Sequence, residues 1–307
     1  MDKSYKFAVV IVTYNRCELL IECIEAVKKQ SFFEIIIVDN CSTDETEKYL
    51  NSLKNTDERL RIIRTNQNNG GAGGFCVGVK TVSKEADYIL LIDDDAILAV
   101  DFLENIQGEI EPGILAYSGS VYTDGIIDKS HRRRLEEMIF LKKKDVALEE
   151  YLENSFLYDL SSFCGLIVDS KLVEKIGYPN KDYFIWYDDT EYSLRIKKYS
   201  QIKNVNSAKI NHKTKFNADN KLTWKSYYGY RNAIAMGREH SKLSWLYLVY
   251  RYGYHVFRIG YFEMKSLLER EKKEYYKNCV KLHQSVIEDS IHHKMGISDC
   301  YFPGKKL

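Results

Sequence analysis

The sequence predicts an α/β protein with a mostly parallel, doubly wound sheet and a helical C-terminal region. Short aliphatic and β-branched runs, which suit buried strands, alternate with segments of helical apolar spacing through the first part of the chain. The connections between these segments are short, as is typical of βαβ units. From Trp224 to the end, the pattern is mostly helical and rich in Tyr, Arg and Lys.

The early elements alternate regularly between strand and helix. Strands are predicted at residues 7–13, 33–38, 60–64 and 88–92. Helices are predicted at residues 16–30 and at about 75–84. A further helix is expected to start from the N-cap residue Ser42, which Glu45 follows three residues later.

Beyond residue 100 the regular alternation ends. Strands are predicted at 115–122 and 163–169, a helix at 188–199, and strand and loop at 202–212. The polar stretch 131–144 carries two basic runs and is expected to be a partly mobile excursion. We expect an α/β domain over 1–220 and a helical region over 221–307.

Composition narrows the class of protein. Lys and Arg number 45 against 44 acidic residues, a net charge of +1, so no nucleic-acid partner is expected. The seven cysteines include no C-x-x-C pair, which favours free thiols in a reducing cytoplasm. The first apolar run is too short for a signal peptide, and no run of about 18 apolar residues predicts a membrane span.

Three adjacent carboxylates, Asp93, Asp94 and Asp95, follow the fourth predicted strand. Ligands of doubly wound sheets bind at the carboxyl ends of strands. Adjacent carboxylates repel one another and require a cation, and their hard oxygens suit Mg²⁺ or Mn²⁺ bound together with substrate phosphates. A solvated acidic turn or a helix N-cap is the alternative interpretation.

A glycine-rich stretch, NQNNGGAGG, occupies residues 66–74. Glycines let the backbone approach a ligand closely, and the helix N-terminus that follows favours phosphate. The stretch is neither a P-loop nor a dinucleotide fingerprint, because no Gly-Lys-Ser/Thr follows it. A flexible turn is the alternative.

Two further positions complete the candidate site. Asp188 and Asp189 follow Trp186 and Tyr187, and a carboxylate in an aromatic pocket can deprotonate an acceptor hydroxyl. A helix start whose acids favour the dipole explains the same residues, and both interpretations can hold. His212 follows a strand; it completes a metal site only if the fold brings it to the triplet, and is otherwise structural or solvated.

These clusters, in this order, resemble the family 2 inverting glycosyltransferases of the GT-A fold. The segments VVIVTYNR, IIIVDNCSTDET, NNGGAGG, LLIDDDA and WYDDTEYSLR and a downstream histidine carry the resemblance over about residues 6–215. LIDDDA, WYDDTEYSLR and the later YYGYRN look closest to bacterial galactofuranosyltransferases and rhamnosyltransferases.

The resemblance implies roles for individual residues. Nucleotide or donor binding is implied for Thr13, Tyr14, Arg16, Asp39, Asn69, Gly70, Gly71, Gly73, Gly74, Asp94, Trp186 and Tyr187. Binding of the divalent metal, Mn²⁺ or Mg²⁺, is implied for Asp93, Asp95 and His212. Asp189 would be the catalytic base, helped by Asp188. A metal neutralises the leaving diphosphate, and direct attack on the opposite face inverts the configuration.

The implied reaction transfers galactofuranose from UDP-galactofuranose to a hydroxyl of a glycan, or of a lipid-linked glycan, in bacterial surface polysaccharide synthesis. Rhamnose from dTDP-rhamnose is the alternative. We expect a single linkage, because the chain begins at the first strand without the N-terminal β domain of the galactofuran polymerases. A nucleotidyltransferase would need a glycine-rich loop where Thr13-Tyr14-Asn15-Arg16 stands, and a non-catalytic glycan-binding protein would not need both acidic clusters.

The segment 245–262 reads WLYLVYRYGYHVFRIGYF. Aromatic residues interleaved with Arg suit a membrane interface, which favours peripheral contact with the inner face of the plasma membrane. Packing on the catalytic domain, or on a second subunit of a homo-oligomer, is the alternative.

Overall fold

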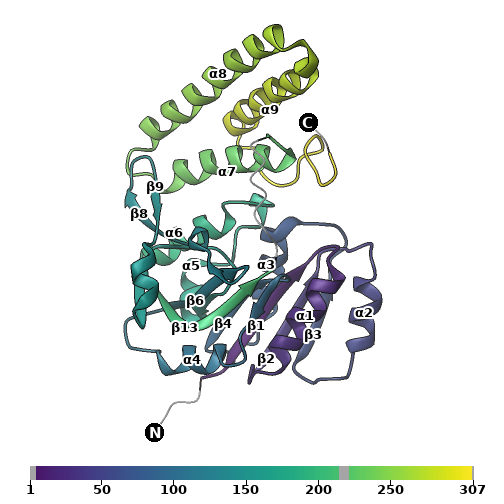
Figure 1. The fold of residues 1–307 in the computed structure, drawn as a ribbon, viewed down its shortest axis with the longest axis vertical. Coiled ribbons are helices and arrows are strands. Elements are labelled where there is room, and N and C mark those ends of the chain that lie inside the picture. Colours follow the sequence, from purple (N-terminus) through teal and green to yellow (C-terminus); the bar gives the residue numbers. More distant parts are fainter. Residues whose placement is uncertain (1–4, 214–220, 306–307) are drawn as a thin grey trace. The chain divides into compact units, whose positions relative to one another are not determined.

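The computed structural model describes residues 5–213 and 221–305, and it confirms an α/β fold followed by C-terminal helices (Figure 1). Within these ranges the chain divides into two compact units. The first contains residues 5–134, 144–181 and 189–213, and the second contains 135–143, 182–188 and 221–305. The expected boundary at residue 220 lies outside the described residues, and the division into 1–220 and 221–307 stays a prediction.

The strands are β1 (Phe7–Thr13), β2 (Glu34–Asp39), β3 (Leu60–Arg64), β4 (Tyr88–Asp93), β5 (Ala96–Leu98), β6 (Ala116–Thr123), β7 (Ile126–Ile127), β8 (Arg132–Glu137), β9 (Lys142–Asp145), β10 (Ser155–Tyr158), β11 (Leu160–Ser161), β12 (Leu166–Asp169) and β13 (Ile202–His212). The α-helices are α1 (Cys17–Lys28), α2 (Thr46–Leu53), α3 (Gly70–Thr81), α4 (Phe102–Gly108), α5 (Ser170–Ile176), α6 (Asp188–Lys197), α7 (Trp224–His240), α8 (Ser244–Leu268) and α9 (Lys273–Ile291). Short 3₁₀ turns are η1 (Lys129–His131), η2 (Leu148–Leu152), η3 (Lys181–Tyr183) and η4 (Arg270–Lys272).

The first unit is built on one large sheet with the strand order β10-β13-β6-β12-β4-β1-β2-β3. Strands β3, β2, β1 and β4 pair in parallel, and β6 pairs in parallel with β13. Strand β12 is antiparallel to both β4 and β6, which it joins. The sheet is therefore mostly parallel, as the sequence predicts.

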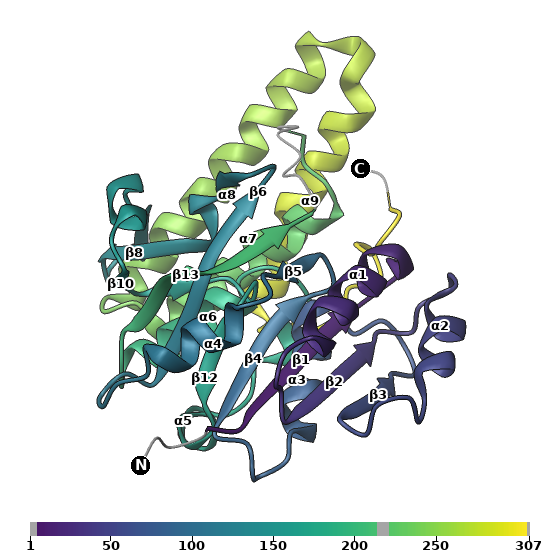
Figure 2. The ribbon, with the colours of Figure 1, turned by 60° about the horizontal axis from the view of Figure 1, so that its bottom comes forward.

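Helices cover both faces of this sheet (Figure 2). Val9 and Ile11 of β1 pack in one buried cluster with residues of α1 and α4. Val10 and Val12, which alternate with them along the strand, pack in a second cluster with residues of α3, α5 and α6. Because every residue of β1 is buried, the strand is continuously apolar from Phe7 to Val12, and this pattern identifies it in the sequence.

Two helix starts differ from the sequence-based expectation. Ser42 is not an N-cap: its hydroxyl accepts from Asn15 N and its N–H donates to Asp39, so it closes the turn after β2. Helix α2 begins only at Thr46. Helix α3 begins at Gly70 instead of about residue 75, so the glycines form its first turns.

Residues 131–144, expected to be a partly mobile excursion, contain regular secondary structure. They contribute β8 and β9 to a three-stranded sheet with β11. Arg132, part of the first basic run, is fully buried, and its guanidinium donates to the carbonyls of Gly119 and Cys164. Carbonyl oxygens from residues distant in the sequence thus stabilise a buried charge.

The second unit is mostly helical. Helices α8 and α9 run side by side as a hairpin in both views, and α7 contacts each of them (Figures 1 and 2). Its core includes Phe184, Tyr227, Tyr228, Ile234, Leu282, Val286 and Tyr301. Within the described residues, no helix combines the length and apolarity that crossing a membrane requires.

Candidate active site

Polar residues gather where the parallel strands end. The register aligns Thr13 with Asp39 across β1 and β2, and Val12 with Asp93 across β1 and β4. These carboxyl ends therefore form one edge of the sheet, which is where ligands of such sheets bind.

Asp94 and Asp95 are buried, and they receive cationic and hydroxyl donors from the first strand and the loop after it. The Thr13 hydroxyl donates to Asp94 at 2.7 Å. Arg16 Nη1 lies 3.3 Å from Asp94 and 2.8 Å from Asp95. A single arginine thus bridges two of the three carboxylates and offsets part of their mutual repulsion.

Asp93 and Asp94 hold their protons more tightly than isolated carboxyls do. Burial, followed by the charges of Asp95 and Asp94, raises the pKa of Asp93 to about 7. Burial raises the pKa of Asp94 to about 6, although Arg16 and Thr13 oppose the shift. A site that destabilises its own anions in this way favours a bound cation.

The structure brings His212 to this cluster from the end of β13. Pairing of His212 with Ala96 of β5 places it beside Asp95, and His212 Nε2 lies 3.5 Å from Asp95 Oδ1. Burial alone would lower the pKa of His212, but its contacts with Asp95 and the charge of Asp93 outweigh burial and raise it.

This donor set fits a divalent metal. His212 Nδ1 is buried and has no hydrogen-bond partner among the described residues. Carboxylate oxygens together with one imidazole suit Mn²⁺ or Mg²⁺. The assignment of Asp93, Asp95 and His212 as the metal ligands stays a prediction.

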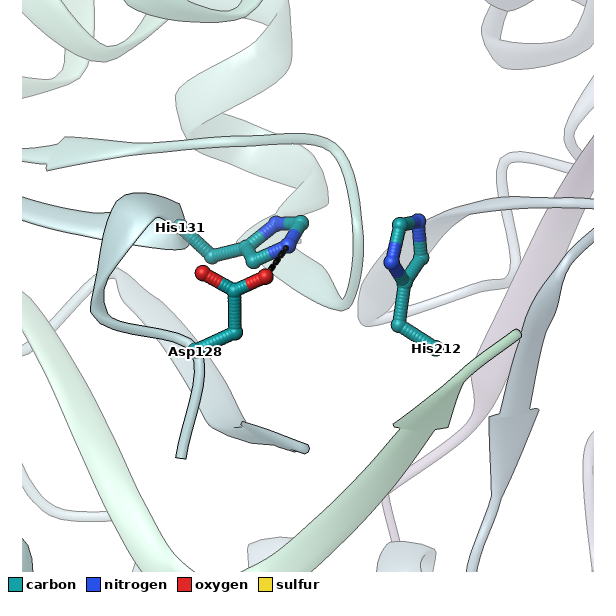
Figure 3. A group of neighbouring side chains, drawn as sticks. All are labelled: Asp128, His131 and His212. Atoms are coloured by element: carbon teal, nitrogen blue, oxygen red, sulfur yellow. Dashed lines mark ion pairs between the residues drawn. The ribbon is translucent and has the colours of Figure 1, made fainter. Parts of the chain in front are cut away.

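Asp128 and His131, which the sequence did not single out, lie next to His212 (Figure 3). His131 Nε2 is 3.4 Å from Asp128, its Nδ1 is 2.7 Å from the Ser162 hydroxyl, and its ring meets that of His212 edge-on at 5.1 Å. Burial lowers the pKa of His131, and the bond from His131 lowers that of Asp128. A histidine oriented by a carboxylate is a common metal ligand, and the ligand atoms of Asp128, His131 and His212 all lie within 4.8 Å of one another. The signal in the sequence was the short spacing D-x-x-H, which ends where the basic run 131–134 begins.

Asp39, expected to bind the base of the nucleotide, is 1% exposed, and both of its carboxylate oxygens have partners within the protein. One accepts from Ser42 N at 2.8 Å, and the other pairs with Arg64 of β3. Each carboxylate oxygen has a second lone pair, so these bonds leave capacity for a ligand. Tyr14, half-buried, follows Thr13 directly in the loop between β1 and α1.

The glycines of α3 serve two different purposes. A Cβ on Gly74 would lie 2.4 Å from Val12 and one on Gly73 would lie 2.5 Å from Asn69 Cβ, so these glycines allow close packing within the chain. Gly70 has a φ of +69°, and its carbonyl accepts from Asn40 at 2.6 Å. A Cβ on Gly71 would meet nothing within 4 Å, so this glycine has room beside it.

Asp189 begins the part of α6 that belongs to the first unit. Its carboxylate accepts from the Thr190 hydroxyl at 3.1 Å, and its carbonyl accepts from Ser193 at 2.8 Å. Further along the helix, Glu191 pairs with Arg195 at 2.9 Å. The helix-start interpretation therefore holds, and it leaves the proposed role of Asp189 as a base open.

Trp186 and Tyr187, in the second unit, adopt left-handed backbone conformations with φ of +65° and +67°. Bulky residues seldom adopt this conformation without support. Asn232 of α7 supports this backbone conformation, because its side-chain amide lies within 3.0 Å of three carbonyls. These belong to Tyr183, Ile185 and Trp186. Asp188, which follows, is buried.

Comparison with known proteins agrees with this architecture. The mostly parallel sheet with C-terminal helices is of the GT-A type: the crystal structure of GalNAc-T7 with UDP, GalNAc and Mn²⁺ superimposes with a TM-score of 0.66, at 13% identity, over 94% of this chain and 58% of that one. The chain belongs to the glycosyl transferase family 2, whose model matches residues 8–168.

Curated relatives are distant. Glycosyltransferase GlyG of Streptococcus pneumoniae is 29% identical over 35% of this chain and 36% of its own length. The dTDP-rhamnosyl transferase RfbF of Shigella flexneri is 25% identical over 62% of each chain. The chain thus matches about a third of the length of GlyG and less than two thirds of RfbF.

Proposed function

We propose that this protein transfers a sugar from a nucleotide-sugar donor to a hydroxyl of a glycan acceptor, with inversion of configuration. The observation that carries the proposal is the meeting of Asp95 and His212 at the polar edge of the sheet, 3.5 Å apart and beside Asp93. Membership of the glycosyl transferase family 2 supports it.

The residues of the first unit would divide the work. The nucleotide would bind beside Thr13, Tyr14 and Arg16. Asp39 would contact the nucleotide's base, and the start of α3, from Asn69, would lie along the donor. A divalent metal held by Asp93, Asp95 and His212 would neutralise the charge of the leaving diphosphate. The GalNAc-T7 structure, which contains UDP and Mn²⁺, supports a divalent metal at the donor site by analogy of fold.

Asp189 would take the proton of the acceptor hydroxyl, and Asp188 would assist it. A base is required because a neutral hydroxyl is a weak nucleophile. Direct attack needs no covalent intermediate, so the product anomer should be opposite to that of the donor.

UDP-galactofuranose is the donor that we favour, on the motif resemblance of LIDDDA, WYDDTEYSLR and YYGYRN. The match to a dTDP-rhamnosyl transferase over 62% of the chain supports dTDP-rhamnose as the second candidate. A glycan, free or lipid-linked, is the acceptor class.

The test measures donor turnover across a panel of sugar nucleotides with Mn²⁺, Mg²⁺ or EDTA. We expect metal-dependent release of a nucleoside diphosphate. Formation of a nucleoside triphosphate and a sugar 1-phosphate when pyrophosphate is added would instead assign a nucleotidyltransferase, and failure of every sugar nucleotide to bind would contradict the proposal.

Replacement of the proposed catalytic base, Asp189, distinguishes a loss of catalysis from a loss of donor binding. Asp189→Asn should lower transfer by about a hundredfold or more while donor affinity stays within a few fold. The control is Asp101→Asn, which changes an exposed carboxylate at the start of α4. Unchanged transfer in Asp189→Asn would remove Asp189 from the role of base.

A further inference from the structure

Helix α8 presents a long apolar face to solvent. Its exposed residues include the large side chains Trp245, Val249, Tyr250, Val256, Phe257, Tyr261, Met264, Leu267 and Leu268. At 100° per residue these positions fall within an arc of about 160° that continues along the whole helix. Glu263 is the only acidic residue on this arc. Such a continuous exposed apolar surface marks an interaction site.

The opposite side of α8 is already occupied. Tyr247, His255 and Phe262 are buried, and His255 Nδ1 lies 2.7 Å from His283 Nδ1 of α9. Tyr247 also donates to the carbonyl of Ala233 in α7 at 2.9 Å. The helix is therefore held by its own unit through one side. On the apolar face, Tyr250 meets the ring of Phe140 edge-on at 5.4 Å, and the large apolar side chains from Val256 to Leu268 on this face stay exposed.

Cations border the apolar face at regular intervals. Arg251, Arg258 and Lys265 recur every seven residues, so they lie in a row along one edge of the arc. Lys265 pairs with Glu269 at 2.6 Å. Arg251 and Arg258 have no carboxylate partner within 5–213 and 221–305, and each has a buried Nε without a hydrogen-bond acceptor there.

Aromatic rings orient the two arginines along this edge. The guanidinium of Arg251 lies 5.8 Å from the ring of Tyr254, and that of Arg258 lies 4.5 Å from the ring of Phe262. The charges are thus held next to apolar surface without an anion. An anion that approaches from the side of the apolar face would neutralise the guanidinium charges and would accept hydrogen bonds from their Nε atoms.

We infer that α8 binds the surface of an anionic lipid bilayer, with its apolar face among the acyl chains and Arg251 and Arg258 at the level of the lipid phosphates. The combination of a wide apolar face, one bordering row of cations and aromatic side chains is that of a helix lying in the membrane interface. This chemistry distinguishes a bilayer from an apolar protein surface, which offers no row of phosphates. The surface would bring the enzyme to lipid-linked acceptors.

The test uses the full chain and vesicle co-flotation, which does not depend on sugar transfer. Vesicles are pure phosphatidylcholine, or phosphatidylcholine with phosphatidylglycerol as the anionic lipid. We expect binding to the anionic vesicles that weakens with salt. Phe257→Glu should lower the partition coefficient roughly tenfold or more, since it replaces an exposed apolar anchor with an acid. Arg251→Gln with Arg258→Gln should lower it by about fivefold for each charge removed.

The matched control is Leu152→Glu, which places the same charge on an exposed apolar residue outside α8. Circular dichroism and thermal melting of each variant establish that it is folded. The inference is overturned if wild-type protein fails to float with anionic vesicles, or if Leu152→Glu weakens flotation as much as Phe257→Glu. It is also overturned if Phe257→Glu converts a dimer to a monomer in sedimentation while vesicle binding is unchanged, since a second copy would then cover this face.

Discussion

Asn232 donates its side-chain amide to the backbone carbonyl of Trp186 at 2.8 Å. The same amide reaches the carbonyls of Tyr183 and Ile185, so one buried side chain holds the turn that leads to Asp188. Trp186 and Tyr187 keep their left-handed backbone within this turn. The YYGYRN segment of α7 thus acts on the WYDD segment, although the two are separated by about forty residues of sequence.

Asn232→Ala should therefore impair catalysis through the turn. Carbonyls that lose buried donors destabilise the fold by roughly 2–4 kcal/mol, and a misplaced turn should lower kcat about tenfold or more with a smaller change in KM. Steady-state kinetics and thermal melting measure both effects. If kcat is unchanged in a variant that melts lower, Asn232 only supports the fold of the second unit.

Gly229→Ala tests the same turn through packing. An added Cβ would lie 2.7 Å from Trp186 Cε3, so the indole must move. We expect a cost of about 1–3 kcal/mol and a shift in tryptophan emission. Gly253→Ala is the matched control, because its Cβ would meet nothing within 4 Å on exposed α8. Equal effects of the two variants would rule out the steric argument.

Asp128 should tune the metal site through His131. Asp128→Asn removes the carboxylate that orients His131, and the apparent affinity for Mn²⁺ should fall roughly 10–100-fold. Activity at saturating Mn²⁺ should recover most of the wild-type rate. A titration of activity against Mn²⁺ makes the comparison, with the exposed Asp145→Asn as control. A loss that excess metal does not restore would place Asp128 elsewhere in the mechanism.

Acid should destabilise the helical unit through the buried pair of His255 and His283. Burial, then the neighbouring charges, lowers the pKa of His255 to about 3, and burial with Arg258 lowers that of His283 to about 4. Unfolded histidines titrate near 6.5, so the unfolded state binds protons first as the pH falls. Stability is thus fully present above about pH 6.5 and is lost progressively towards pH 3–4.

Between pH 7 and 5 this loss should amount to roughly 2 kcal/mol for each histidine. All three tryptophans, Trp186, Trp224 and Trp245, belong to the second unit, so their fluorescence reports its unfolding. Urea titrations at pH 7 and pH 5 measure the difference. In the double variant His255→Phe with His283→Leu, the free energy of unfolding should depend less on pH. If it depends on pH as steeply as in the wild type, other groups cause the dependence.

Local pattern determined much of the fold. Strands β1 to β4 were predicted within one or two residues, because buried parallel strands need continuous apolar runs. The predicted starts of α2 and α3 were misplaced. A residue such as Ser42 or Gly70 occurs in turns as well as at helix ends, so the sequence does not show which of the two it forms. The burial of Arg132 was not predicted, because a sequence does not show which carbonyls will surround a charge.

The sequence by itself determined the α/β class, the acidic triplet at the end of β4 and the candidate residues around it, since each of these depends on neighbours in the chain. Only the tertiary structure decided that His212 meets Asp95, that Asp128 and His131 stand beside it, and that Asn232 holds the turn at Trp186. These contacts join residues dozens to more than a hundred positions apart. They depend on strand register and helix packing, which balance many weak interactions that no local pattern records.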